Sequence, residues 1–204
     1  MDKIDHKSLL KPLYSPSAKE PVFADVPDMN FIMLDGKGNP NASQLYQDTV
    51  SALFQLSYAI KFFFKKSQGI DYSVMPLEGL WWVEDMSLFS IDDKDSWLWT
   101  MMIMQPEPVV QEQFEQQRQE VIKKKGTTIL SNARFENYHE GFSVQMMHIG
   151  PYSAEGPNIA RMHESARQNG YINFGKHHEI YLGDVRKTAP EKLKTVLRQP
   201  VKKI

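Results

Sequence analysis

Two acidic side chains in apolar, strand-like segments are the first candidates for chemistry in this sequence. Glu179 lies in the run 178–182, and Glu78 lies in the run 77–84. Residues two apart on a strand share a face, so we expect Glu179 to point with Tyr181 and Glu78 to point with Trp82. Burial against aromatic rings raises the pKa of a carboxyl group, which can then act as a general base toward water or as a general acid toward a leaving oxygen. The predicted catalytic residues are therefore Glu179, Tyr181 and Glu78.

A second set of residues could form the wall of a ligand pocket. Tryptophan and tyrosine offer flat apolar surface, methionine adapts to varied shapes, and histidine adds a polar group. Each of these residue types is also common in a protein core, and a glutamate in a strand is often exposed or paired with a cation; both alternatives stay open here. The predicted ligand-binding residues are Trp82, Trp97, Trp99, Met101, Met146, His148 and Tyr152.

Metal and cofactor motifs are not found. The chain has no cysteine, which excludes thiolate zinc sites and cysteine nucleophiles. The neighbouring His177 and His178 would face opposite sides of a strand, and the pair His163-Glu164 is followed by Arg167 where a zinc-binding helix motif needs histidine. We predict no metal and no cofactor.

The elements that must position these residues follow from periodicity and turn signals. Helices are predicted over about 44–66, from Pro108 to Gly126, and over 157–168, with a short basic helix from about Pro190. Strands are predicted over 31–34, 77–84, 96–104, 142–149 and 178–182, with a turn at 91–95. Both faces of the strand 96–104 are largely apolar. A helix layer covers only one of them, so the other needs a second layer, a partner or a ligand.

The order of these elements repeats along the chain. Strand, glycine turn, helix and strand occur twice, which indicates two similar halves related by a pseudo-two-fold axis. That axis would bring Glu78 and Glu179 into one groove between the halves. We divide the chain into an N-terminal arm over 1–21 and a domain over 22–204, with repeats over about 22–126 and 127–204.

Composition excludes several classes of function. The 204 residues are 41% hydrophobic and carry a net charge of −1, so no field over the whole surface would attract nucleic acid or anionic lipid. No run of 18 apolar residues and no signal-peptide pattern is present. We therefore expect a cytoplasmic protein with no membrane association and no direct binding of nucleic acid; the oligomeric state stays open.

Several short motifs together resemble a known family. Met147-His-Ile-Gly-Pro-Tyr152, the helix after it, Gly170-Tyr171 and His178-Glu-Ile-Tyr-Leu-Gly-Asp184 are similar to the GyrI-like small-molecule-binding domain. In the first half, Phe31–Pro40 and Leu77–Trp82 resemble a stand-alone branch of that family. The resemblance covers roughly residues 22–200, and the family also supplies the effector-binding half of multidrug-responsive transcription regulators.

The resemblance implies a fold and a site. The fold is α+β, with two β-α-β-β repeats, an antiparallel sheet with helices on one face, and a ligand groove between the repeats. A glutamate on a late strand, here Glu179, would meet polar or cationic parts of hydrophobic ligands. Some stand-alone members resemble hydrolases that open cyclopropane rings of DNA-alkylating natural products.

We therefore expect binding of hydrophobic small molecules, such as xenobiotics, in the inter-repeat pocket. Hydrolysis of strained, cyclopropanoid electrophiles in a detoxification role is the enzymatic form of this expectation, and whether the protein is an enzyme stays open. One alternative is a non-catalytic module that sequesters or senses a drug. Another is a gyrase-inhibitor-like role in protein interaction, although no sequence feature marks a surface for it.

Overall fold

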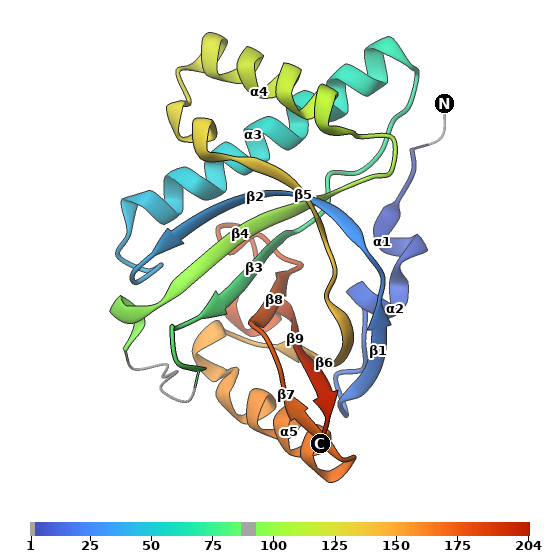
Figure 1. Ribbon diagram of the computed structural model, residues 1–204, viewed down its shortest axis with the longest axis vertical. Coiled ribbons are helices and arrows are strands. Elements are labelled where there is room, and N and C mark those ends of the chain that lie inside the picture. The colour runs from blue at the N-terminus through green and yellow to red at the C-terminus, as the bar shows by residue number, and fades with distance from the viewer. Residues whose placement is uncertain (1–2, 87–92) are drawn as a thin grey trace. The chain divides into compact units, whose positions relative to one another are not determined.

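Antiparallel strands and covering helices make up both units into which the chain divides (Figure 1). The computed structural model describes residues 3–86 and 93–204. Unit 1 consists of Met1–Leu9, Met29–Leu77 and Trp82–Tyr138, and unit 2 consists of Leu10–Asp28, Glu78–Trp81 and His139–Ile204.

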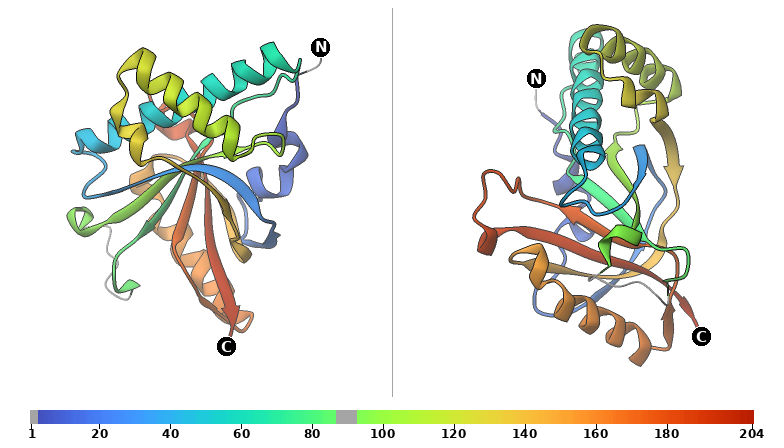
Figure 2. Two further views of the ribbon diagram at one scale, coloured as in Figure 1. Left: turned by 45° about the horizontal axis from the view of Figure 1, so that its top comes forward. Right: turned by 90° about the vertical axis from the view of Figure 1, so that its left-hand side faces the viewer.

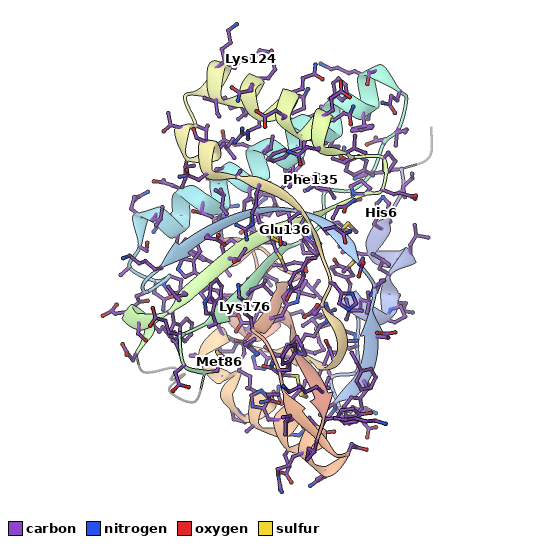
Figure 3. All side chains as sticks on the ribbon, in the orientation of Figure 1. His6, Met86, Lys124, Phe135, Glu136 and Lys176 are labelled. Carbon is purple, nitrogen blue, oxygen red and sulfur yellow. The ribbon has the colours of Figure 1, made fainter. Side chains whose placement is uncertain are left out.

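Unit 1 is built on three antiparallel strands in the order β4-β2-β5. Strand β2 (Met29–Lys37) lies between β4 (Leu98–Gln105) and β5 (Arg134–Tyr138). Two longer helices, α3 (Gln44–Ser67) and α4 (Gln111–Lys125), pack against each other, and α3 also contacts β2 and β4 (Figure 2). Phe135 of β5, labelled in Figure 3, stacks on Phe114 of α4, and this contact holds the edge strand against that helix. The short α1 (His6–Leu9) also belongs to this unit.

Local sequence determines where the long helices begin and end. The side chain of Ser43 accepts a hydrogen bond from the Tyr46 amide and caps α3. Apolar residues at helical spacing, among them Leu53, Leu56 and Ile60, are fully buried on one face of that helix. Helix α4 ends at Gly126, whose φ of 68° is the left-handed conformation that glycine adopts without strain.

Unit 2 contains strands in the order β1-β6-β9-β8-β3. They are β1 (Val22–Val26), β6 (Gly141–Ile149), β9 (Lys194–Lys203), β8 (His177–Tyr181) and β3 (Leu77–Trp82), of which Glu78–Trp81 belongs to this unit. The short β7 (Tyr171–Asn173) pairs with the end of β9. Helices α2 (Lys11–Tyr14) and α5 (Gly156–Gln168) complete the unit.

The two faces of the unit 2 sheet have different covers. Met162 and Ala166 of α5 pack on Val144, Met146 and Leu197 in a fully buried apolar cluster. We call this side the helix face. On the other side, which we call the arm face, two backbone carbonyls of α2 accept hydrogen bonds: that of Pro12 from Gln145 of β6, and that of Leu13 from Arg198 of β9.

The α+β class and the antiparallel pairing of strands are confirmed. The predicted helices over 44–66 and 157–168 correspond to α3 and α5, and the order strand–helix–strand–strand occurs as β2-α3-β3-β4 and as β6-α5-β8-β9, with β7 inserted. Strand β1 lies in unit 2 and β5 in unit 1, because strands are grouped by their hydrogen-bonding partners and not by position in the chain. The division into an arm and two sequence repeats stays a prediction.

The prediction of a short basic helix from about Pro190 is wrong. A 3-10 turn at Pro190–Lys192 leads directly into β9, which pairs with β6 on one side and with β8 on the other. Thr195, Val196 and Leu197 are all buried, as expected for a central strand that is covered on both faces. Lysines at both ends of β9 are exposed, and such basic residues are also typical of a surface helix, which is why the sequence pattern was misleading. Part of the predicted turn at 91–95, namely positions 91 and 92, lies outside the described residues.

Among residues 3–86 and 93–204, no helix combines the length and the apolar composition that crossing a membrane requires.

Candidate functional site

Strand β8 presents chemically active side chains on both faces of the unit 2 sheet. His178 lies opposite Arg198 in the β8–β9 register, and Glu179 lies opposite Leu197. Since alternate residues of a strand point to opposite faces, His178 points to the arm face, whereas Glu179 and Tyr181 point to the helix face. The site must therefore be described separately on each face.

On the helix face, a directed chain of hydrogen bonds ends at Glu179. The indole Nε1–H of Trp81 donates to the hydroxyl of Tyr181 over 3.0 Å, and that hydroxyl donates to Glu179 Oε2 over 2.7 Å. The side chain of Glu179 keeps 14% of its exposure, so solvent or a ligand can reach it. A carboxylate held in this way by a phenol has a fixed orientation and one remaining oxygen for another partner.

Two further side chains border Glu179. The ring of Tyr152 meets the ring of Tyr181 edge to face at 5.4 Å, and Nε2 of His177 lies 3.4 Å from Glu179 Oε1. Burial, together with the charges of Glu155 and Glu179, raises the pKa of Tyr152 to about 12. The Tyr152 hydroxyl therefore keeps its proton at neutral pH and can donate a hydrogen bond. We call Glu179, Tyr181, Trp81, Tyr152 and His177 the Glu179 cluster.

On the arm face, five buried polar side chains form a separate network. His178 Nδ1 lies 2.8 Å from Glu140 Oε1, and its Nε2 lies 3.0 Å from Glu78 Oε2. The Tyr14 hydroxyl donates to Glu78 Oε1 over 2.7 Å, and Arg198 Nη1 donates to Glu140 Oε2 over 2.9 Å. We call these five residues the arm-face network.

The contacts of His178 determine its charge. A carboxylate oxygen can only accept, so both ring nitrogens must donate and the ring must be protonated. Burial alone would lower the pKa of His178, but the charges and hydrogen bonds of Glu140 and Glu78 outweigh burial and raise it to about 9. Burial would likewise raise the pKa of Glu140, but His178 and Arg198 outweigh it and lower it to about 2. Two positive groups thus face two carboxyl groups, which is how a buried ionic cluster avoids uncompensated charge.

The expected pairing of Glu78 with Glu179 is wrong. Glu78 is fully buried and bonded to His178 and Tyr14 on the arm face, whereas Glu179 lies on the helix face. The physical reason is the pairing of β3 with β8: Trp81, not Glu78, shares a face with Tyr181. Glu78 is a member of a closed structural network, and a catalytic role for it is not supported by this placement.

The other predicted residues divide between the two units. Trp82, Trp97, Trp99 and Met101 lie in unit 1, where Trp99 and Met101 are fully buried. The ring of Trp99 lies over Gly36 and meets Tyr46 edge to face, which is the environment of a core residue. A ligand role for these four residues stays a prediction.

In unit 2, Met146 belongs to the apolar cluster under α5. His148 is buried, and its Nε2 lies 3.1 Å from the Pro151 carbonyl. Since a carbonyl only accepts, Nε2 carries the proton, and Nδ1 accepts from Asn158 over 3.0 Å. Both ring nitrogens of His148 are thus engaged by the protein, and its contact with a ligand stays a prediction.

Sequence reasoning missed several members of the two clusters. Strand alternation places His177 on the same face as Glu179 and Tyr181, so this residue could have been found from the sequence. Trp81, Tyr14, Glu140 and Arg198 come from distant segments that only strand pairing and the path of the arm bring together. In the part of the chain that the structure describes, no group of three or more His, Cys, Asp or Glu side chains could hold a metal ion.

Comparison with known proteins relates this geometry to one family. The family model for a GyrI-like small molecule binding domain matches residues 19–202. Among solved structures, an uncharacterized conserved protein from Listeria innocua is 42% identical with a TM-score of 0.91, and the match covers 98% of this chain and 100% of the other. A hydrolase from the same organism is 40% identical with a TM-score of 0.88 and the same coverage.

A more distant similarity concerns the fold alone. The EcmrR C-terminal domain is 14% identical with a TM-score of 0.58, and the match covers 91% of this chain and 98% of that domain. No curated protein matches the chain.

Proposed function

Because the chain belongs to the GyrI-like small molecule binding domain family, we propose that it binds a hydrophobic small molecule beside Glu179 and opens strained rings of such molecules by adding water. The observation that carries this proposal is the hydrogen-bond chain from Trp81 through Tyr181 to Glu179. Similarity to a Listeria hydrolase over nearly the whole chain supports the enzymatic part.

Binding follows from the chemistry of the Glu179 cluster. The aromatic faces of Tyr152 and Tyr181 offer apolar contact, and the partly exposed carboxylate offers a counter-ion. Aromatic faces and a carboxylate together favour a lipophilic cation or a polarised aromatic compound. Natural products and xenobiotics of this chemistry are the proposed ligands.

Ring opening needs a base, a positioned water and a hydrogen-bond donor. For a cyclopropane conjugated to a dienone, the oxygen of water forms a bond to the ring methylene, and a ring carbon–carbon bond breaks. The released electron pair moves through the dienone to its oxygen, which takes up a proton as the phenol forms. Glu179 is the proposed base that accepts the proton of the water.

The donor to the developing oxyanion is assigned to Tyr152. The proton of Tyr181 is already engaged with Glu179 over 2.7 Å, whereas Tyr152 stays protonated and its ring is in contact with that of Tyr181. A positioned donor of this kind typically contributes about a hundredfold or more to the rate. Tyr181 then acts by orienting the carboxylate and not by donating to the substrate.

The binding part is tested with tetraphenylphosphonium, a lipophilic aromatic cation, by titration calorimetry. We expect Glu179→Gln to weaken its affinity by about tenfold, or about 1.4 kcal/mol, because the variant removes the counter-ion of a cation that has no hydrogen-bond donor of its own. Glu164→Gln is the matched control, because this substitution removes the same charge from an exposed position on α5, where Glu164 pairs with Arg167. Equal affinity of the Glu179→Gln variant and the wild type would contradict a ligand beside Glu179.

The hydrolytic part is tested with a spirocyclopropyl dienone and mass detection of its water adduct. We expect Glu179→Gln and Tyr152→Phe each to lower kcat by about a hundredfold or more. Uncatalysed ring opening in buffer is the baseline. Tight binding of the dienone with no adduct above that baseline would contradict the proposed hydrolysis and would favour the alternative of a non-catalytic binding module.

A further inference from the structure

A shallow hollow lies on the helix face of unit 2, among residues outside the Glu179 cluster. Its volume is about 320 Å³, and it is lined by Phe142, Tyr171, Val201, Lys202 and Lys203. This volume is at the lower end of the range for small-molecule sites, which fits a compound of one or two rings. We call it the aromatic hollow.

The aromatic walls of this hollow pack against a third ring and against each other. Phe23 of β1 stacks on Phe142 with ring centroids 5.5 Å apart and an interplanar angle of 5°, and it contacts Tyr171 at 5.4 Å. Phe142 and Tyr171 meet at 5.2 Å. Phe142 nevertheless keeps 38% of its exposure, so part of its side chain remains accessible to a ligand.

The floor of the hollow is equally fixed. Tyr171 and Val201 belong to the β7–β9 ladder, in which Tyr171 is paired with Lys203. The backbone amide of Ile204 donates to the Gly170 carbonyl over 3.1 Å, which ties down the chain beyond β9. A site built in this way loses little conformational entropy when it binds a ligand.

The charge at the rim is positive. Neither Lys202 nor Lys203 takes part in an ion pair among the described residues, and both are exposed. The ammonium of Lys202 lies over the ring of Phe174 at 4.8 Å, so Lys203 is the cation left for a ligand. Asp25 is opposite Phe142 in the β1–β6 register, but it does not line the hollow.

We propose that the aromatic hollow is a second ligand site, which takes a planar aromatic carboxylate. The ring system packs against the exposed part of the Phe142 ring, and the carboxylate pairs with Lys203. Ring stacking supplies apolar contact area and orients the ligand, and the lysine favours a ligand with a negative charge. This ligand class is opposite in charge to the cation proposed for Glu179, so the two sites are separable by experiment.

The probe is naphthoate, and its neutral counterpart is naphthalenemethanol. We expect naphthoate to shift the amide resonances of Phe142, Tyr171 and Lys203, and we expect the alcohol to bind about twofold to fivefold more weakly. Lys203→Gln should weaken naphthoate by about twofold to fivefold, as expected for the loss of one exposed charge pair, and Phe142→Leu by about threefold to tenfold, as expected for the loss of one ring stack. Lys203→Arg should retain the affinity and shows that the position tolerates substitution.

Lys194→Gln is the matched control, because it removes the same charge from the exposed opposite end of β9. Glu179→Gln separates this proposal from the proposed function and should leave naphthoate binding unchanged. Equal affinity for naphthoate and the alcohol would overturn the proposal. So would a loss of affinity in Glu179→Gln but not in Lys203→Gln, since the probe would then occupy the Glu179 cluster.

Discussion

His178 and Glu179 are neighbours in β8, yet their side chains serve different purposes. His178 is enclosed by Glu78 and Glu140 with no exposure, whereas Glu179 keeps 14% and is bonded to one phenol. Every hydrogen-bonding position of the His178 ring is used, so it has no proton to exchange with a substrate. Exposure, and a second carboxylate oxygen whose neighbour is His177 Nε2 at 3.4 Å, are what make Glu179 the candidate for chemistry.

The arm-face network gives a stability prediction at the scale of one residue. Glu140 pairs with both Arg198 and His178, so Glu140→Gln would leave two buried cations facing only Glu78. Breaking a buried ionic cluster in this way costs about 3–5 kcal/mol. We expect urea unfolding to show a loss of that size in the free energy of unfolding.

Glu164→Gln is the control for this experiment, because Glu164 forms an exposed pair with Arg167 and should change the unfolding free energy by no more than about 0.5 kcal/mol. A loss of less than about 1 kcal/mol for Glu140→Gln would show that the network is not held by charge.

At the scale of elements, the pairing of β2 with β4 buries the ring of Trp99 in the core, where it is not accessible to a ligand. Gly36 lies opposite Trp99 in that register, and a Cβ on Gly36 would lie only 2.0 Å from the nearest atom of the indole ring. The ring therefore occupies the space that a side chain at position 36 would need. This contact explains why glycine stands in the interior of a strand, where it is otherwise unfavourable.

A substitution at this position tests the packing of Trp99. We expect Gly36→Ala to destabilise the protein by about 1–3 kcal/mol, because the indole ring must move from its place in the core. The measurement is the midpoint of urea unfolding, with near-UV circular dichroism to report on the tryptophan environment. Gly156→Ala is the matched control: an added Cβ there meets nothing within 4 Å, and alanine favours the helix. A stabilising effect of Gly36→Ala would show that the ring does not cover this glycine.

At the scale of the whole molecule, the arm-face network makes stability depend on pH in both directions. The pKa of His178 is raised from 6.5 to about 9, so its contribution is complete below pH 6.5 and is lost as the pH rises through about 9. The pKa of Glu140 is lowered from 4.5 to about 2, so its contribution is complete above pH 4.5 and is lost as the pH falls toward 2. Both contributions are complete between pH 4.5 and 6.5.

We expect scanning calorimetry to show the highest unfolding temperature in that window, with a decline on each side. His178→Gln removes the group that titrates on the alkaline side, so its unfolding temperature should change less between pH 6.5 and 9 than that of the wild type. The same alkaline decline in the variant and the wild type would assign it to other groups, for example the tyrosines.

The sequence by itself determined the α+β class, the antiparallel strands, helices α3 and α5, and the shared face of Glu179 and Tyr181. These features depend on periodicity within one segment, and periodicity is a local property of the chain. Only the tertiary structure decided that β9 is a strand between β6 and β8. It also decided that Trp81, and not Glu78, lies on the same face as Glu179. Glu78 instead belongs to the arm-face network with Tyr14 and His178. Each of these depends on which distant segments form hydrogen bonds with each other. Which segments pair depends on the burial and hydrogen bonding of the whole unit, so the pattern of residues within a single segment cannot predict it.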